Sequence, residues 1–135
     1  YPYLEKDALE FINAMVQHQG KQEAFPFAIT VNDRAIGSIG VFRKDNIHFR
    51  TAELGYYLSE QYWGQGLMTS AVKQMCEFIF SETDIVRIFA MPFSHNLASC
   101  RVLEKAGFVL EGELRKNAVK NGEFYNMKMY GLLKD

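Results

Sequence analysis

A glycine-containing turn between an expected strand and an expected helix constrains the fold of this chain most. Residues 61–69 read Gln-Tyr-Trp-Gly-Gln-Gly-Leu-Met-Thr, directly after the apolar, aromatic-rich run 51–58. Apolar residues then recur at helical spacing over 66–81, and a short apolar run follows at 86–91. This order predicts a strand–helix–strand unit whose two strands are parallel.

The glycine pair predicts a binding site for an anion. Gly64 and Gly66 allow a tight turn and present backbone N–H groups that no Cβ obstructs. The helix that follows adds unpaired N–H groups and the positive end of its dipole, which suits a pyrophosphate. The alternative is a tight turn without a ligand. Neither a P-loop nor the dinucleotide fingerprint is present, because no Gly-Lys-Ser/Thr follows and the third glycine is missing.

The rest of the chain reads as one mixed α/β domain over residues 1–135, which is too short for two domains. Apolar spacing predicts an opening helix over 4–16, and another helix is expected between a capping Asn96 and a terminating Gly107. Further strands are expected at 25–31, 35–42, 108–114 and 124–132. The order predicts a mixed sheet with helices on both faces.

Composition narrows the classes of function. Fifteen basic and sixteen acidic side chains leave a net charge of −1, so the chain lacks the excess of positive charge typical of proteins that bind nucleic acid nonspecifically. The sequence shows no signal peptide and no apolar run of transmembrane length, so we expect a cytoplasmic protein without a membrane partner. Three scattered histidines predict no metal site, and Cys76 and Cys100 do not suggest a disulfide framework.

A second motif identifies a family. Residues 96–108 read Asn-Leu-Ala-Ser-Cys-Arg-Val-Leu-Glu-Lys-Ala-Gly-Phe. Together with 61–69, this motif resembles the GCN5-related N-acetyltransferase (GNAT) superfamily, above all the branch of ribosomal-protein N-terminal and spermidine acetyltransferases. The resemblance covers about 37–135 and implies the GNAT fold, with acetyl-CoA as acetyl donor. In that fold the strands expected here at 51–58 and 86–91 splay apart and admit the pantetheine arm.

Members of the superfamily usually carry a further strand and one or two helices ahead of the region that matches here. The chain begins at Tyr1 rather than at a methionine. We therefore expect the N-terminal part of the fold to be missing, which would leave a sheet edge and a core face without their usual cover. An exposed apolar surface of that kind is compatible with a homodimer.

The resemblance assigns donor-binding residues along both motifs. It implies a pyrophosphate cradle at Trp63, Gly64, Gln65, Gly66, Leu67, Met68 and Thr69. Asn96 matches the asparagine that hydrogen-bonds the pantetheine arm, and its alternative role is the helix N-cap. Arg101 and Lys105 are candidates for the 3′-phosphate or the adenine end, against a solvated helix face. Trp63 has an alternative role as a half-exposed packing residue.

Acetyl transfer needs a neutral amine, a stabilised carbonyl oxygen and a stabilised thiolate. By resemblance Glu53 is the candidate general base, and its alternative is a strand-end glutamate paired with a lysine or arginine. A backbone N–H of Tyr57 or Leu58 is the candidate donor to the carbonyl oxygen. Ser99 is the candidate proton donor on the sulfur side, and its alternative is a serine that bonds the local backbone.

One position departs from the family pattern. Many members carry a tyrosine as general acid four residues beyond Ser99, where this chain has Leu103. Leucine cannot donate a proton, which leaves Ser99, water, Tyr125 or Tyr130 for that role.

The resemblance predicts an N-acetyltransferase whose acceptor is a primary amine, which leaves a protein N-terminus, a polyamine or a small amine open. Asn126 stands where relatives often have an aspartate, which disfavours a strongly cationic acceptor at that spot. Two other functions remain open. One is a non-catalytic sensor of acetyl-CoA or CoA with the same fold, and the other is an interaction domain that binds neither.

Overall fold

The computed structural model describes residues 9–13, 17–19 and 22–135. The described strands form one sheet of order β1-β3-β4-β5-β6-β8-β7, with β2 also paired to β3. Only β5 and β6 run parallel among these pairs, so the predicted mixed sheet is confirmed. The elements are β1 (Leu9–Asn13), β2 (Gln17–Gln19), β3 (Gln22–Val31), β4 (Arg34–Arg43), η1 (Asn46–His48), β5 (Thr51–Leu58), η2 (Glu60–Tyr62), α2 (Leu67–Glu82), β6 (Arg87–Ala90), α3 (Leu97–Lys105), β7 (Val109–Lys120) and β8 (Glu123–Leu133).

The helix predicted over 4–16 is wrong where the structure describes it. Leu9–Asn13 is strand β1, which pairs antiparallel with β3 at the edge of the sheet. Apolar spacing over so few residues does not separate a helix from a strand, and a neighbouring sheet edge satisfies the backbone groups of β1 in a ladder. The remaining positions of that expected helix, 4–8 and 14–16, lie outside the described residues.

The other expected strands and helices are confirmed, with small shifts of their ends. The β3–β4 and β7–β8 hairpins turn through two residues with positive φ, which is the type I′ geometry that matches strand twist. These are Asn32 (+52°) and Asp33 (+65°) between β3 and β4, and Asn121 (+53°) and Gly122 (+78°) between β7 and β8. Strand β7 continues past the predicted end at 114, because two register shifts let it bend and stay paired with β8.

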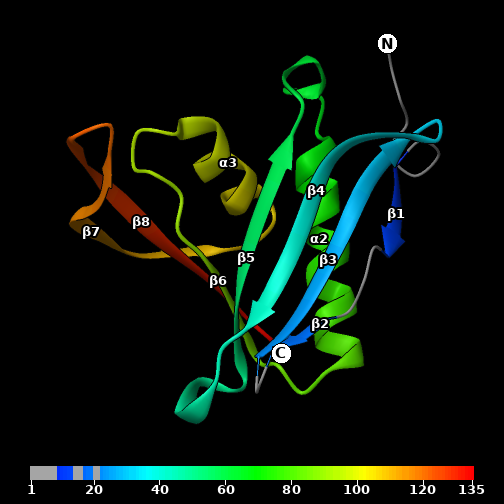
Figure 1. Ribbon diagram of the computed structural model, residues 1–135, viewed down its shortest axis with the longest axis horizontal. Coiled ribbons are helices and arrows are strands. Elements are labelled where there is room, and N and C mark those ends of the chain that lie inside the picture. Colours follow the sequence, from blue (N-terminus) through cyan, green and yellow to red (C-terminus); the bar gives the residue numbers. More distant parts are fainter. Residues whose placement is uncertain (1–8, 14–16, 20–21) are drawn as a thin grey trace.

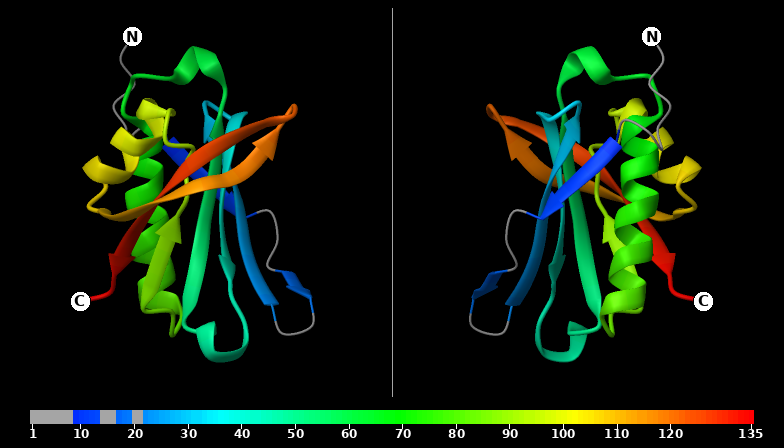
Figure 2. Two further views of the ribbon diagram at one scale, coloured as in Figure 1. Left: turned by 90° about the vertical axis from the view of Figure 1, so that its left-hand side faces the viewer. Right: turned by 90° about the vertical axis from the view of Figure 1, so that its right-hand side faces the viewer.

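The two described α-helices lie on the same face of the sheet and contact each other (Figure 2). Beneath them the strands bury alternate side chains, such as Val41 of β4 and Leu54 of β5. The intervening residues Glu53, Gly55 and Tyr57 therefore face away from α2. Among the described residues no α-helix covers that opposite face, so the helical cover expected there is not among the described elements.

Helix α2 buries its apolar stripe in the core. Cys76 on that stripe is buried, and burial raises the pKa of its thiol to about 12. Cys100 of α3 is also buried, and both cysteines are free thiols. Among the described helices, none combines the length and the apolar character that crossing a bilayer requires.

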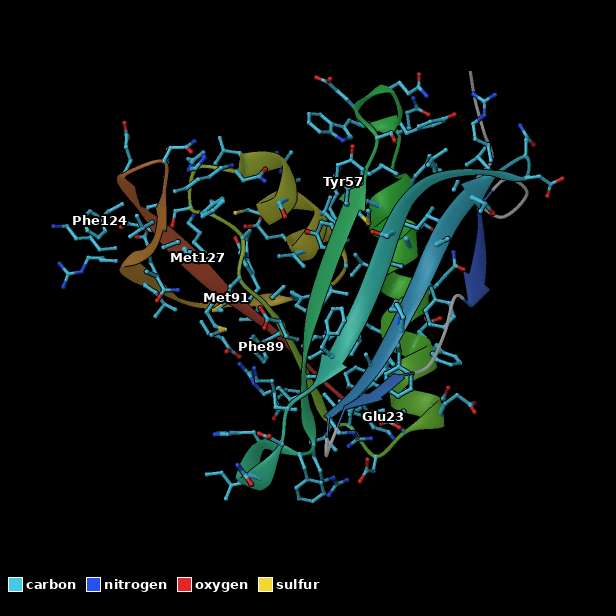
Figure 3. All side chains as sticks on the ribbon, in the orientation of Figure 1. Glu23, Tyr57, Phe89, Met91, Phe124 and Met127 are labelled. Atoms are coloured by element: carbon cyan, nitrogen blue, oxygen red, sulfur yellow. The ribbon has the colours of Figure 1, made fainter. Side chains whose placement is uncertain are left out.

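Strands β5 and β6 separate soon after they begin to pair. Their ladder covers only Thr51–Glu53 of β5 and the facing residues 87–89 of β6. Beyond this point β5 stays beside β4 up to Leu58, whereas the chain after β6 follows β8. Figure 1 shows α3 between these two arms, and in Figure 3 Tyr57 lies on one arm and Met127 on the other. The predicted splay of the two parallel strands is confirmed.

Strands β4 and β5 approach each other so closely at Gly37 that we expect a larger residue there to destabilise the fold. Gly37 faces Leu58, and a Cβ at Gly37 would lie 3.1 Å from the Leu58 Cα and closer still to the Tyr57 carbonyl oxygen. Backbone atoms cannot move aside cheaply, so we expect Gly37→Ala to reduce the free energy of unfolding by about 1–3 kcal/mol. Urea denaturation measures this. The control Gly112→Ala adds a Cβ with no neighbour within 4 Å, and equal losses for both variants would contradict the packing argument.

Candidate functional site

The turn before α2 has the geometry that the glycine pair predicted. Gly64 and Gly66 adopt φ of +76° and +78°, a region that favours glycine, and Gly66 is the N-cap of α2. The first hydrogen bond of the helical ladder runs from the Ser70 N–H to the Gly66 carbonyl at 3.1 Å. Helical geometry therefore leaves the N–H groups ahead of Ser70 without a partner inside the helix. Leu67 and Met68 bury their side chains in the core, so only their backbone can contact a ligand.

Trp63 holds this turn against the end of β5, and Gln65 bonds locally to the preceding segment. The Trp63 indole N–H donates to the Leu58 carbonyl at 2.7 Å, although 58% of Trp63 is exposed. The Gln65 side-chain amide donates to the Gln61 carbonyl at 3.3 Å. Thr69, in the first turn of α2, is half-buried. Trp63 thus has the packing role that the sequence left open, and its exposed ring remains free to contact a ligand.

The backbone of β5 presents one of the two candidate N–H donors to the opening between β5 and β6. The Ser59 N–H donates to the Ile36 carbonyl at 2.8 Å, on the β4 side of the strand. Because ladder groups alternate along an antiparallel strand, the Tyr57 N–H also faces β4. The Leu58 N–H points the other way, toward the opening. This alternation favours Leu58 over Tyr57 as donor to a ligand.

Glu53 lies where β5 and β6 part. It is opposite Phe42 of β4 on one side and Phe89 of β6 on the other, in the last pair of the parallel ladder. Its side chain is half-buried and belongs to the face away from α2. Within residues 22–135, no lysine or arginine forms an ion pair with Glu53, so the paired role that the sequence left open is not observed there.

The N-terminus of α3 holds Ser99 from two directions. The Asn96 side-chain oxygen accepts a hydrogen bond from the Ser99 N–H at 3.1 Å, which confirms Asn96 as the N-cap and leaves its amide NH₂ available. The Ser99 hydroxyl oxygen lies 2.7 Å from the Tyr56 hydroxyl. The sequence did not single out Tyr56. Because side chains alternate along β5, Tyr56 faces the helices, opposite to its neighbour Tyr57. Its contact with Ser99 depends on how α3 packs.

The charged residues assigned to α3 are solvated in this structure. Arg101 and Lys105 are both exposed, and no ion pair of either was found among the described residues. A solvated helix face was the alternative role expected for these two residues, and it leaves both side chains accessible to an anionic ligand.

Leu103 and the two tyrosines that remained candidates for the proton donor, Tyr125 and Tyr130, have different surroundings. Leu103 is fully buried in the core. Tyr130 is 0% exposed, and its hydroxyl donates to a Glu104 carboxylate oxygen at 2.8 Å. Tyr125 packs its ring against Phe93, with centroids 5.4 Å apart. Tyr130 is therefore an aromatic residue of the core.

Several of the predicted residues lie on β5 or contact it directly. Glu53 lies on one face of the sheet, and Ser99 with Tyr56 lies on the other. The Leu58 N–H faces the opening between the arms, and the α2 turn adjoins the end of β5 through Trp63. This arrangement suits a group transfer between two ligands that approach from opposite faces.

Comparison with known proteins gives the family. Residues 1–109 match the family model of the acetyltransferase (GNAT) domain. The chain belongs to the GNAT acetyltransferases. This GNAT chain is 38% identical over 115 residues to the probable N-acetyltransferase YjcK of Bacillus subtilis, a match that covers 84% of the chain and 64% of YjcK.

Solved GNAT structures agree with the fold. The ribosomal-protein-S5-alanine acetyltransferase from Vibrio fischeri superposes with a TM-score of 0.77 at 29% identity, over 83% of this chain and 62% of that one. The microcin C7 self-immunity acetyltransferase MccE, solved with acetyl-CoA and AMP, has a TM-score of 0.72 at 27% identity, over 82% and 61%. The chain thus spans just under two thirds of the length of these proteins.

Proposed function

We propose that this chain binds acetyl-CoA and transfers its acetyl group to a primary amine. The separation of β5 from β6 carries the proposal, because it exposes one edge of β5 between a carboxylate and a hydroxyl. Membership of the GNAT family supports it, as does the acetyl-CoA complex of MccE.

The residues around the opening fit the donor. The N–H groups at the start of α2 suit the pyrophosphate, because a helix N-terminus attracts anions. The free amide NH₂ of Asn96 suits the carbonyl groups of the pantetheine arm. The exposed side chains of Arg101 and Lys105 suit the 3′-phosphate. Acetyl-CoA would supply a thioester, which an amine attacks directly.

The chain's own residues then divide the chemistry between them. Glu53 takes a proton from the amine on its face of the sheet, directly or through a water molecule, so that the nitrogen attacks as a neutral nucleophile. As the carbon–nitrogen bond forms, the Leu58 N–H donates to the carbonyl oxygen, which gains negative charge. The carbon–sulfur bond breaks, and the Ser99 hydroxyl gives its proton to the departing sulfur.

The acceptor reaches the site from the face of Glu53 and Tyr57, where Tyr57 is 64% exposed. A protein N-terminus, a polyamine and a small primary amine all carry the required group. The Vibrio fischeri relative is named for an alanine of a ribosomal protein, which makes a peptide with a free N-terminal alanine the first acceptor to test.

Calorimetric titration with acetyl-CoA tests the donor, with ATP and NAD as controls. We expect micromolar, selective binding, since both controls carry the phosphates but lack the pantetheine arm. Mass spectrometry then follows acetylation of the alanine peptide, spermidine and a simple alkylamine. Binding without transfer to any amine would favour the sensor function, and no binding of acetyl-CoA would refute the proposal.

A further inference from the structure

A hydrogen bond connects β5 to α3 across the opening between the two arms of the sheet. The Tyr56 hydroxyl lies 2.7 Å from the Ser99 hydroxyl oxygen and 3.3 Å from the Ser99 carbonyl oxygen. The Tyr56 ring packs against the core, so its position is fixed by the fold rather than by solvent. The contact therefore holds the one side chain of α3 that the proposed function uses as a proton donor.

The direction of this hydrogen bond decides what Ser99 can do. A phenol has one proton, so its two contacts compete, and 2.7 Å is the usual length of an O–H···O bond whereas 3.3 Å is long. A phenol is also more acidic than an aliphatic hydroxyl and is the better donor. Burial raises the pKa of Tyr56 and keeps its proton in place. The contact admits either hydroxyl as donor, and these lengths and acidities favour Tyr56, which leaves the Ser99 proton free to point elsewhere.

Ser99 is also fixed through its main chain. Its N–H donates to the Asn96 side-chain oxygen at 3.1 Å, which anchors the first turn of α3. With the backbone held by Asn96 and the oxygen held by Tyr56, little freedom remains apart from the direction of the serine O–H. Fixed donors of this kind need no reorganisation during a reaction.

We infer that Tyr56 is a positioning residue for acetyl transfer, because its hydroxyl donates to Ser99 Oγ and directs the serine O–H toward the sulfur of the donor. This inference rests on the proposed function. When the carbon–sulfur bond breaks, its electron pair stays on sulfur and the Ser99 proton moves there. As the Ser99 proton leaves, the Tyr56 proton moves to the serine oxygen, because a phenol is more acidic than an aliphatic alcohol, and water then returns a proton to the Tyr56 oxygen. A phenol thus serves the sulfur side although position 103 holds leucine.

Tyr56→Phe removes only the hydroxyl and tests the inference directly. We expect kcat to fall at least about tenfold while the KM for acetyl-CoA stays within about twofold, because the contact acts on the transfer step. In a Ser99→Ala background the same change should cause no further loss, because the two hydroxyls act as a unit. The control is Tyr130→Phe, which also removes a phenol bonded to α3 but leaves Ser99 untouched. We expect this control to keep kcat.

Binding of CoA gives a readout that does not depend on turnover. Calorimetry compares CoA with desulfo-CoA, which lacks the sulfur. We expect Tyr56→Phe and Ser99→Ala each to weaken CoA binding several-fold and to leave desulfo-CoA binding unchanged. A general distortion of α3 would weaken both ligands alike, and that result would overturn the positioning role.

Other outcomes are equally decisive. A kcat for Tyr56→Phe equal to or above that of the unchanged chain would mean that Tyr56 accepts the serine proton, which overturns the inference. Additive losses in the double variant would overturn it too. If Tyr56→Phe does not fold, Ser99→Thr and Ser99→Ala test the contact from its other end, and equal activity of these two variants would refute it. If the unchanged chain binds neither CoA nor acetyl-CoA, the proposed function fails and the inference fails with it.

Discussion

Glu53→Gln should reduce kcat for acetyl transfer by about 10²-fold or more at neutral pH, the usual contribution of a general base. The change keeps the shape of the side chain and removes its ability to accept a proton. Glu53 is half-buried where β5 and β6 part, so water replaces it poorly as a base. Rates of CoA release with the acceptor that the amine panel identifies measure the effect. The Kd for acetyl-CoA should stay unchanged, because Glu53 lies on the opposite face from Ser99.

The pH dependence of Glu53→Gln provides a second expected result. Without a base, only amine that is already neutral in solution attacks. The rate of the variant should therefore rise about tenfold per pH unit until the pKa of the amine, roughly 8 for a peptide N-terminus and roughly 10 for an alkylamine. The control is Glu77→Gln, an exposed carboxylate on α2 that should behave like the unchanged chain. Equal activity of the two variants would remove Glu53 from the mechanism.

Local sequence patterns predicted most of the fold because each rests on a local physical cause. The glycines at 64 and 66 require positive φ, and both adopt it. Asn96 caps α3 through the Ser99 N–H, and the Phe108 N–H returns to the Leu103 carbonyl at 3.0 Å where Gly107 ends the helix. The helix predicted for the opening segment was wrong because the conformation of this segment depends on a partner strand. The edge of β3 supplies a ladder to Leu9–Asn13, and the spacing of apolar residues does not reveal that edge.

The candidate site, too, could be predicted from the sequence only in part. Side chains alternate between the two faces of β5, so Glu53 and Tyr57 lie on one face and Tyr56 on the other. This alternation can be read from the sequence once the strand is predicted. The sequence does not contain the packing of α3, which brings Ser99 to Tyr56 over a separation of 43 residues. The choice of Leu58 over Tyr57 as N–H donor also needed the register with β4. Tertiary contacts therefore decided which groups meet, whereas local sequence decided which groups were available.

Gly64→Ala should weaken the binding of acetyl-CoA at least about tenfold, which corresponds to about 1.4 kcal/mol. Gly64 adopts φ of +76° and no atom lies within 4 Å of a Cβ built there, so the chain itself offers no obstacle besides the strained backbone. Gly122→Ala is a matched control, since its φ is +78° and its Cβ also meets nothing within 4 Å, at the tip of the β7–β8 hairpin. Both variants should lose about 1–2 kcal/mol of unfolding free energy. Only a ligand held by the α2 turn distinguishes them in calorimetry, so equal acetyl-CoA affinities for the two variants would contradict a phosphate cradle at Gly64.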